Sequence, residues 1–270
     1  MVFISGGAAG IGLGMAHVFA EQGMKIALAD IDNNALKDAH NALEAQGAEV
    51  MTFSLDITES DAVKEAARET VTRFGSVHMV CANAGVGGFM GPLYEGSDAD
   101  WDWAIDVNLK GAVNTIQAFL PVLIQNQDES HIVITSSVSG LRVHQPNRGQ
   151  GMYNTTKFAL VGLGEALSLD LQPHGIGVSV LCPGIVKTDI TNSARNRQKK
   201  YGGAVTRSSE HELASAAAHG TDPVEFGRWV LKGIERDQLY IITHTDDRDQ
   251  VERRHAGIMQ AFDDCERLKQ

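Results

Sequence analysis

A tyrosine and a lysine four residues apart, Tyr153 and Lys157, have the clearest potential for chemistry in this sequence. They lead into an apolar segment, 158–171, that indicates a helix, and residues i and i+4 of a helix share one face. A free phenol has a pKa of about 10 and exchanges protons poorly near neutrality. An ammonium about 4 Å away, at an effective dielectric of about 20, would stabilise the phenolate by about 4 kcal/mol, which is enough to lower that pKa toward about 7. The spacing favours a proton-transferring tyrosine, although such a pair also arises by chance.

A glycine-rich turn near the N-terminus indicates a dinucleotide site. The apolar run 2–4 enters a turn with Gly6, Gly10 and Gly12, after which hydrophobic residues recur at helical spacing. Such glycines let the backbone approach a pyrophosphate, which then lies on the amide-rich N-terminus of the helix. Taken alone, the turn is equally compatible with a purely structural role.

Asp30 ends the next expected strand, eighteen residues after Gly12. A carboxylate at this strand end can accept hydrogen bonds from both ribose hydroxyls of an adenosine and would repel a 2′-phosphate. The positions where an arginine could compensate for such a phosphate carry Ala9 and Ile31. The sequence therefore favours NAD over NADP.

Strand and helix patterns alternate along the chain, which predicts an α/β fold: a doubly wound parallel sheet of the Rossmann type with helices on both faces. The expected strands are 2–4, 25–30, 49–54, 78–82, 131–135, 176–182 and 238–243. Helices are expected after the glycine turn, at 33–46, 59–73, 97–123, 155–171 and 222–235, and from about 247 onward. We expect a single domain, 1–270, in which 191–220 forms a substrate lid and 245–270 a C-terminal helical extension.

Composition narrows the class of protein. A chain of 270 residues with 43% hydrophobic content can bury a sizeable core. Its net charge of −11 argues against a nucleic-acid or anionic-membrane partner and favours a small-molecule substrate. No signal sequence is recognisable and no apolar run approaches the length of a membrane span, so we expect a cytoplasmic protein. The widely spaced Cys81, Cys182 and Cys265 indicate neither a disulfide framework nor a metal site, and the first two are expected in the core.

Two features of the second half leave alternatives open. A basic run in the expected lid could contact an acidic substrate, although such runs are more often solvated faces. The run comprises Arg195, Arg197, Lys199 and Lys200. His144, between the expected strand at 131–135 and Tyr153, could line a substrate pocket.

The ordered set of motifs resembles the short-chain dehydrogenase/reductase family over nearly the whole chain. The resemblance is carried by the Gly6-x-x-x-Gly10-x-Gly12 and Tyr-x-x-x-Lys spacings and by Asp30, Asp56, the Asn83-Ala84-Gly85 turn, Asn108, Ser137 and the run from Pro183 to Thr188. Ser5 and Ala82 depart from the family pattern, which usually has Thr and Asn there. A looser similarity of the C-terminal part to bacterial Cα-dehydrogenases of lignin-type aryl ethers suggests a bulky or aromatic secondary alcohol as substrate.

The resemblance also implies roles for these residues. Tyr153 would be the general acid/base, Lys157 would lower its pKa and hold the nicotinamide ribose, and Ser137, rather than Ser136, would orient the substrate oxygen. Asn108 would anchor a water that links Lys157 to solvent. The implied cofactor contacts are Gly6, Gly10, Ile11, Gly12, Asp30, Asp56, Ile57, Asn83, Ala84, Gly85, Tyr153, Lys157, Pro183, Gly184, Ile185, Val186 and Thr188.

The resulting expectation is an NAD-dependent oxidoreductase that interconverts a secondary alcohol and a ketone. The alternatives are a carbonyl reductase working in the reverse direction and, in a different class, a catalytically silent NAD-sensing regulator. Helix 155–171 is apolar over more of its circumference than one sheet face can cover, which predicts a homodimer or homotetramer.

Overall fold

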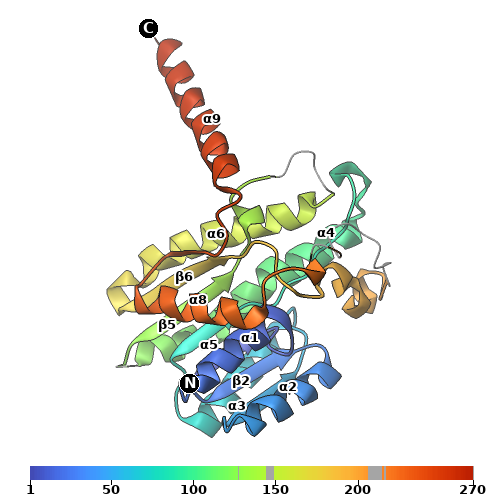
Figure 1. The fold of residues 1–270 in the computed structure, drawn as a ribbon, viewed down its shortest axis with the longest axis vertical. Helices are drawn as coiled ribbons and strands as arrows, with labels where there is room; N and C mark the ends of the chain where they lie inside the picture. Colours follow the sequence, from blue (N-terminus) through green and yellow to red (C-terminus); the bar gives the residue numbers. More distant parts are fainter. Residues whose placement is uncertain (127, 144–148, 206–214, 216, 270) are drawn as a thin grey trace.

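The computed structural model describes residues 1–126, 128–143, 149–205, 215 and 217–269, and a seven-stranded parallel sheet with helices on both faces forms its centre (Figure 1). The strand order is β3-β2-β1-β4-β5-β6-β7, which confirms the predicted fold class. The strands are β1 (Val2–Ser5), β2 (Ile26–Asp30), β3 (Val50–Ser54), β4 (Met79–Ala82), β5 (Ser130–Thr135), β6 (Ile176–Cys182) and β7 (Tyr240–Ile242). The strand expected at 238–243 is shorter in the structure, because β7 lies at the sheet edge with its outer residues Tyr240 and Ile242 exposed.

The helices divide between the two faces of the sheet. On one face lie α3 (Ser60–Phe74), α5 (Gly111–Gln125) and α6 (Gly151–Leu171), and on the other lie α1 (Gly10–Glu21), α2 (Asn33–Ala45) and α8 (Pro223–Glu235). Strand residues alternate between these layers: in β1, Phe3 packs against Phe119 of α5, whereas Val2 and Ile4 face the other layer. Both sides of each central strand are thus buried, as parallel sheets require.

The helix predicted at 97–123 is interrupted in the structure. It consists of α4 (Asp98–Ile105), a π-helical turn (Asp106–Lys110) and α5, and the Gly111 N–H donates to the Asp106 carbonyl across the wide turn. Ser97 caps α4 and forms a capping box with Asp100. Periodicity alone did not reveal the single inserted residue of the π turn, and such turns often mark functional sites.

The stretch Asp98–Gln125 is long and apolar enough to cross a membrane by length and composition, contrary to the expectation from sequence. Three of its large side chains, Trp103, Ile116 and Phe119, are buried inside the protein, with exposures of 2% or less. Ile116 and Phe119 pack against the sheet. We therefore describe this stretch as a core element.

The last helix, α9 (Arg248–Arg267), extends away from the rest of the chain (Figure 1). None of its residues is buried, and Ile258, Met259 and Phe262 are exposed. Near its start, the Arg254 guanidinium lies 4.8 Å from the ring centroid of Phe158 on α6. Two of the free cysteines, Cys81 and Cys182, are buried as expected, and Cys265 on α9 is exposed.

Candidate active site

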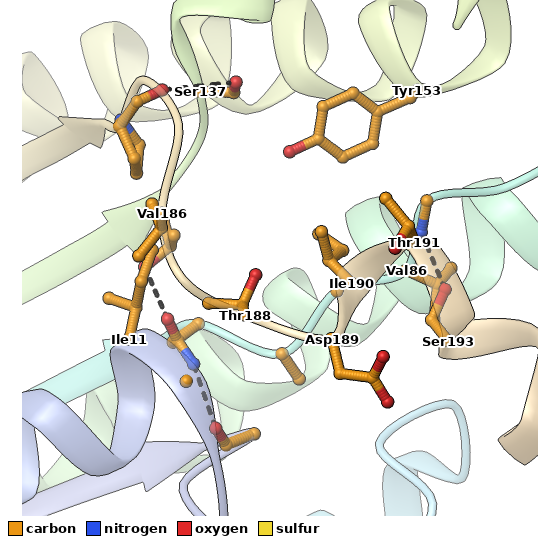
Figure 2. A pocket seen from close by; sticks show the side chains of 18 of the residues that line it. Ile11, Val86, Ser137, Tyr153, Val186, Thr188, Asp189, Ile190, Thr191 and Ser193 are labelled. Atoms are coloured by element: carbon orange, nitrogen blue, oxygen red, sulfur yellow. Dashed lines mark hydrogen bonds between the residues drawn. The ribbon is translucent and has the colours of Figure 1, made fainter. Parts of the chain in front are cut away.

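A cavity of about 620 Å³ lies beyond the carboxyl ends of the parallel strands, where ligands bind in such folds. Figure 2 shows part of it, with the phenol of Tyr153 pointing into the space between Ser137 and Ile190. Most of the sequence-predicted site residues line it: Gly6, Gly10, Ile11, Asp30, Asp56, Ile57, Asn83, Ala84, Gly85, Ser137, Tyr153, Lys157, Pro183, Gly184, Ile185, Val186 and Thr188. Gly12 and Asn108 do not line the cavity and lie behind its wall.

The glycine turn is a place of close backbone approach. Gly6 has φ +63°, and a Cβ there would lie 2.7 Å from the Cα of Ala84. A Cβ at Gly12 would lie 2.1 Å from the carbonyl oxygen of Gly6. The N-cap residue of α1, Ala9, offers no side-chain oxygen, so the first N–H groups of α1 are left for a ligand. Since Ala9, Gly10 and Ile11 all line the cavity, this end of α1 suits a pyrophosphate.

Asp30 stands at the carboxyl end of β2 with its carboxylate at the cavity wall. Its two oxygens accept hydrogen bonds from the backbone N–H groups of Ala8, at 3.2 Å, and Asp32, at 3.1 Å. Burial raises the pKa of Asp30, and these hydrogen bonds oppose the rise. Each carboxylate oxygen keeps acceptor capacity for the hydroxyls of a ribose.

Asn83 ties three strands together beneath the cavity. Its amide nitrogen donates to the carbonyls of Ser5 and Gly6, both at 3.1 Å, and its amide oxygen accepts from the hydroxyl of Thr135 at 3.0 Å. The Ser5 hydroxyl accepts from the Asn83 N–H at 3.1 Å. Serine at position 5 therefore still provides a hydroxyl that accepts a hydrogen bond.

Lys157 is almost completely buried, at 2% exposure. Its ammonium donates to the Thr135 carbonyl at 2.8 Å and lies 5.5 Å from the ring centroid of Tyr153. Burial lowers the pKa of Lys157 to about 8 and raises the pKa of Tyr153 to about 12, an effect that a hydrogen bond with Ser137 opposes. The predicted lowering of the phenol pKa by the lysine is thus wrong for this structure, because desolvation dominates and the ammonium is held at the Thr135 carbonyl.

Two adjacent serines, Ser136 and Ser137, follow β5, and their hydrogen bonds indicate different roles. The Ser136 hydroxyl donates to the Lys157 carbonyl at 2.8 Å and is engaged in bracing α6. The Ser137 hydroxyl accepts from the Ser139 N–H at 3.1 Å and lies 3.5 Å from the Pro183 carbonyl oxygen. Because the Ser137–Pro183 contact is long, the Ser137 hydroxyl can turn toward a ligand oxygen near Tyr153.

Asn108 lies in the π turn and is fully buried. Its side-chain oxygen accepts from the Val86 N–H at 2.7 Å, and its nitrogen donates to the Val86 carbonyl at 3.0 Å and to the Thr156 hydroxyl at 2.9 Å. The side chain therefore braces the chain after β4 against α6. The implied water at Asn108 stays a prediction.

Several cavity residues carried no signal in the sequence. Arg142 is 3% exposed and pairs with Asp247 at 2.8 Å, which connects the segment after β5 to the residue before α9. Both line the cavity, as does His244, which accepts from the Gly184 N–H at 3.3 Å. None of them belongs to a motif, so only their contacts reveal them. His144 lies outside the described residues.

Residues 1–199 match the family model of the short chain dehydrogenases. The chain belongs to the short-chain dehydrogenase/reductase family. A Cα-dehydrogenase of Sphingobium sp. strain SYK-6 is 35% identical over 263 residues, covering 96% of this chain and 85% of the relative. A CLA biosynthesis dehydrogenase/reductase of Lactiplantibacillus plantarum is 31% identical, covering 94% of this chain and 91% of the relative.

Solved structures show the same likeness. A short-chain dehydrogenase/reductase from Burkholderia phymatum, in complex with NAD, superposes with a TM-score of 0.89 at 32% identity, covering 96% of this chain and 94% of that chain. The apo form of LigD from Sphingobium sp. strain SYK-6 gives a TM-score of 0.79 at 31% identity, with coverages of 96% and 95%. This chain is accordingly an oxidoreductase acting on CH–OH groups, and the family resemblance inferred from its sequence is confirmed.

Proposed function

We propose that this protein is an NAD-dependent oxidoreductase that interconverts a secondary alcohol and a ketone. The observation that carries the proposal is the convergence of Ser137, Tyr153 and Lys157 on the cavity that also receives the glycine turn and Asp30. Bound NAD would supply the hydride acceptor, or in its reduced form the hydride donor. Asp30 would hold the adenosine ribose and the start of α1 the pyrophosphate.

The chain's own residues would handle the proton. Tyr153 would take the proton from the substrate hydroxyl, or return it to the carbonyl, while the Ser137 hydroxyl holds the substrate oxygen. Lys157, anchored to the Thr135 carbonyl, would place its charge beneath the phenol and the nicotinamide ribose. Asn108 would act as a positioning residue through Thr156 on α6.

One observation favours the reverse direction as a second candidate. Burial raises the pKa of Tyr153 from 10.0 to about 12, which further disfavours the phenolate needed to accept a proton from an alcohol and leaves the protonated phenol that donates to a carbonyl. A carbonyl reductase is therefore the alternative. The complete set of Asn108, Ser137, Tyr153 and Lys157 speaks against a catalytically silent NAD sensor.

For the substrate we propose a bulky, aromatic secondary alcohol. The support is the similarity to the Cα-dehydrogenase and the apolar cavity wall formed by Val86, Met90, Val138 and Ile190. The test is a spectrophotometric screen of benzylic, alicyclic and aliphatic alcohols with NAD, and of the matching ketones with NADH. Turnover of aliphatic substrates alone would reject the aromatic assignment, and no turnover in either direction would reject the proposed activity.

Asp30 should control the choice between NAD and NADP. We expect the wild type to bind NAD at least about 100-fold more tightly than NADP, because a 2′-phosphate would meet a carboxylate. Asp30→Ser should weaken NAD binding about tenfold and strengthen NADP binding by a similar factor, about 1.4 kcal/mol each. Isothermal titration with both cofactors measures this, and Asp38→Ser, at an exposed position on α2, is the control. An unchanged preference in Asp30→Ser would contradict the assignment.

We further propose that the protein is a cytoplasmic homodimer or homotetramer that uses the outer face of α6. Gly162, Ala166 and Leu169 are exposed along this face, and Leu169 is 72% exposed. Sedimentation velocity at micromolar concentration should show a dimer or tetramer, and Leu169→Glu should shift it toward smaller species because a buried charge opposes association. A wild-type monomer under these conditions would rule this assembly out.

A further inference from the structure

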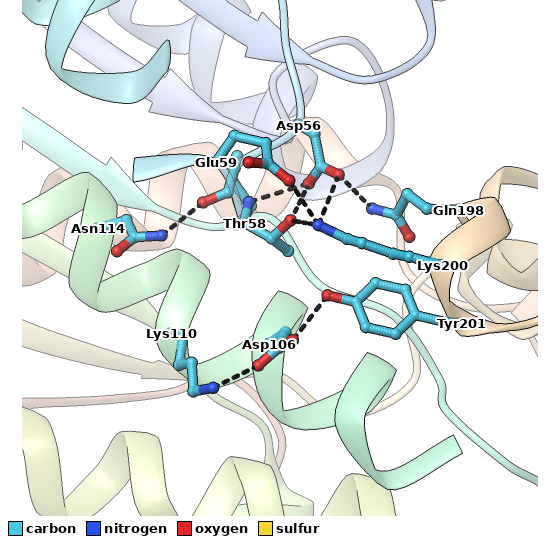
Figure 3. Close-up of polar contacts among 10 residues, drawn as sticks. Asp56, Thr58, Glu59, Asp106, Lys110, Asn114, Gln198, Lys200 and Tyr201 are labelled. Carbon is cyan, nitrogen blue, oxygen red and sulfur yellow. Dashed lines mark hydrogen bonds and ion pairs between the residues drawn. The ribbon is translucent and has the colours of Figure 1, made fainter. Parts of the chain in front are cut away.

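Residues 197–201, here called the clasp, connect the turn at Asp56, at one end of the cavity, to the π turn at Asp106 (Figure 3). The Gln198 amide donates to Asp56 Oδ2 at 2.9 Å, and the Lys200 ammonium donates to Glu59 Oε1 at 2.5 Å. The Tyr201 hydroxyl donates to Asp106 Oδ2 at 2.7 Å. The clasp therefore binds both to the turn after β3 and to the π turn.

A second anchor holds the start of the clasp in place. The Arg197 guanidinium pairs with Asp100 at 2.6 Å, and the two side chains are only 10% and 14% exposed. The guanidinium also lies 5.2 Å from the ring centroid of Trp103. The basic run of the sequence is thus neither a uniformly solvated face nor a free set of charges for an acidic substrate. Arg197 and Lys200 fix the position of Gln198 between them.

The two polar atoms of the Gln198 amide differ in their hydrogen bonding: within the described residues the nitrogen has a partner and the oxygen has none. It lines the cavity together with Ile31, Leu55, Asp56 and Ile57. A carboxylate can only accept, so the nitrogen of the amide must face Asp56 and the oxygen must face away. Within the part of the chain that the structure describes, this Oε1 is buried without a hydrogen-bond partner. A buried, unpaired acceptor is costly, so a donor that reaches it is bound favourably.

We propose that Gln198 is a cofactor-specificity residue that recognises the 6-amino group of adenine. The inference rests on the proposed use of NAD, whose adenine, as the family resemblance implies, would lie between Asp56 and Ile57. An exocyclic amino group has two N–H donors, and Asp56 can accept one of them. The terminal torsion of a glutamine is soft, so Oε1 can turn to accept the other while Nε2 stays near Asp56.

This arrangement would reject a base with an oxygen in place of the amino group. A 6-oxo group has no hydrogen to donate, so its oxygen would lie against two acceptors, Gln198 Oε1 and the Asp56 carboxylate. Reversing the Gln198 amide would not relieve this conflict, because Oε1 would then face the Asp56 carboxylate, to which Nε2 now donates. Gln198 therefore distinguishes adenine from hypoxanthine through a residue that lies outside the usual strand-end motifs of this sequence.

The test compares NAD with nicotinamide hypoxanthine dinucleotide, which differs only in the base. Dissociation constants are measured by titration calorimetry for the wild type, Gln198→Leu, Gln198→Ala and Lys199→Ala. Lys199 is the control because it is exposed in the same clasp and does not line the cavity. Thermal melts of each variant verify that it is folded.

We expect the wild type to prefer NAD over the hypoxanthine analogue by at least about tenfold. Both Gln198 variants should lose about tenfold in NAD affinity, about 1.4 kcal/mol, with little change for the analogue, and Lys199→Ala should behave as the wild type. An unchanged preference in the Gln198 variants would overturn the assignment while leaving the use of NAD intact. Tighter NAD binding in these variants would overturn it as well, because Gln198 would then compete with adenine for Asp56. Failure of the wild type to bind either dinucleotide would instead refute the proposed function on which it rests.

Discussion

Replacing Tyr153 with phenylalanine is expected to lower kcat by a factor of about 10² to 10⁴, the range contributed by a positioned general acid or base. The change removes only the hydroxyl, which points into the cavity beside Ser137 (Figure 2). The affinity for NAD should stay within about threefold, since the ring remains in place. Steady-state kinetics in both directions, together with cofactor titration, measure the two effects separately.

A matched control for this prediction is Tyr240→Phe. Tyr240 lies on β7, where its hydroxyl donates to Glu165, and it does not line the cavity. Its loss should leave kcat unchanged. Hydride transfer that continued at the wild-type rate in Tyr153→Phe would refute the assignment of the proton-transferring group.

Replacing Lys157 with methionine should lower kcat by about 10² or more, yet raise the stability of the fold at pH 7. Burial lowers the folded-state pKa of Lys157 to about 8 from an ordinary value of 10.5. At pH 7 the protein therefore holds a charge that is less favourable inside than in the unfolded chain, at a cost of up to about 3 kcal/mol. Methionine has a similar length and carries no charge, although the Thr135 carbonyl loses its donor.

The pH dependence gives this prediction a definite sign. Between pH 8 and 10.5 the unfolded chain binds more protons at Lys157 than the folded chain does, so the stability of the wild type should rise with pH across this window. Lys157→Met should lack that rise. The pKa of Tyr153 is raised to about 12, so this residue should make the stability fall with rising pH, but only above about pH 10, where a free tyrosine begins to ionise.

Urea unfolding at pH 7, 8, 9 and 10 measures the effect of Lys157 on stability. Lys37→Met, an exposed lysine on α2, should leave the pH profile of the wild type unchanged. A strongly destabilised Lys157→Met at pH 7 would show that the hydrogen bond to Thr135 outweighs the cost of the buried charge. Identical pH profiles for Lys157→Met and the wild type would show that the pKa of Lys157 is not lowered in the fold.

Local patterns in the sequence were sufficient to predict the fold class and the set of candidate residues. Apolar periodicities of strand and helix depend on residues a few positions apart, and the glycine turn, Asp30 and the Tyr153–Lys157 spacing are equally local. Parallel strands end at one edge of a sheet, so their terminal polar residues had to meet at one cavity. For this reason the cavity contains nearly all of the predicted residues.

The contacts that set the chemistry of these residues could not be predicted before the fold was known. The Lys157 ammonium could reach either the phenol or the Thr135 carbonyl, and the burial of both side chains determines their pKa values. Gln198 meets Asp56 across 142 positions of sequence, and the Arg142–Asp247 pair spans 105. Such contacts depend on the paths of whole segments through space, and local patterns carry no information about them. The protonation states and the proposed recognition of adenine therefore follow from the packing of the chain.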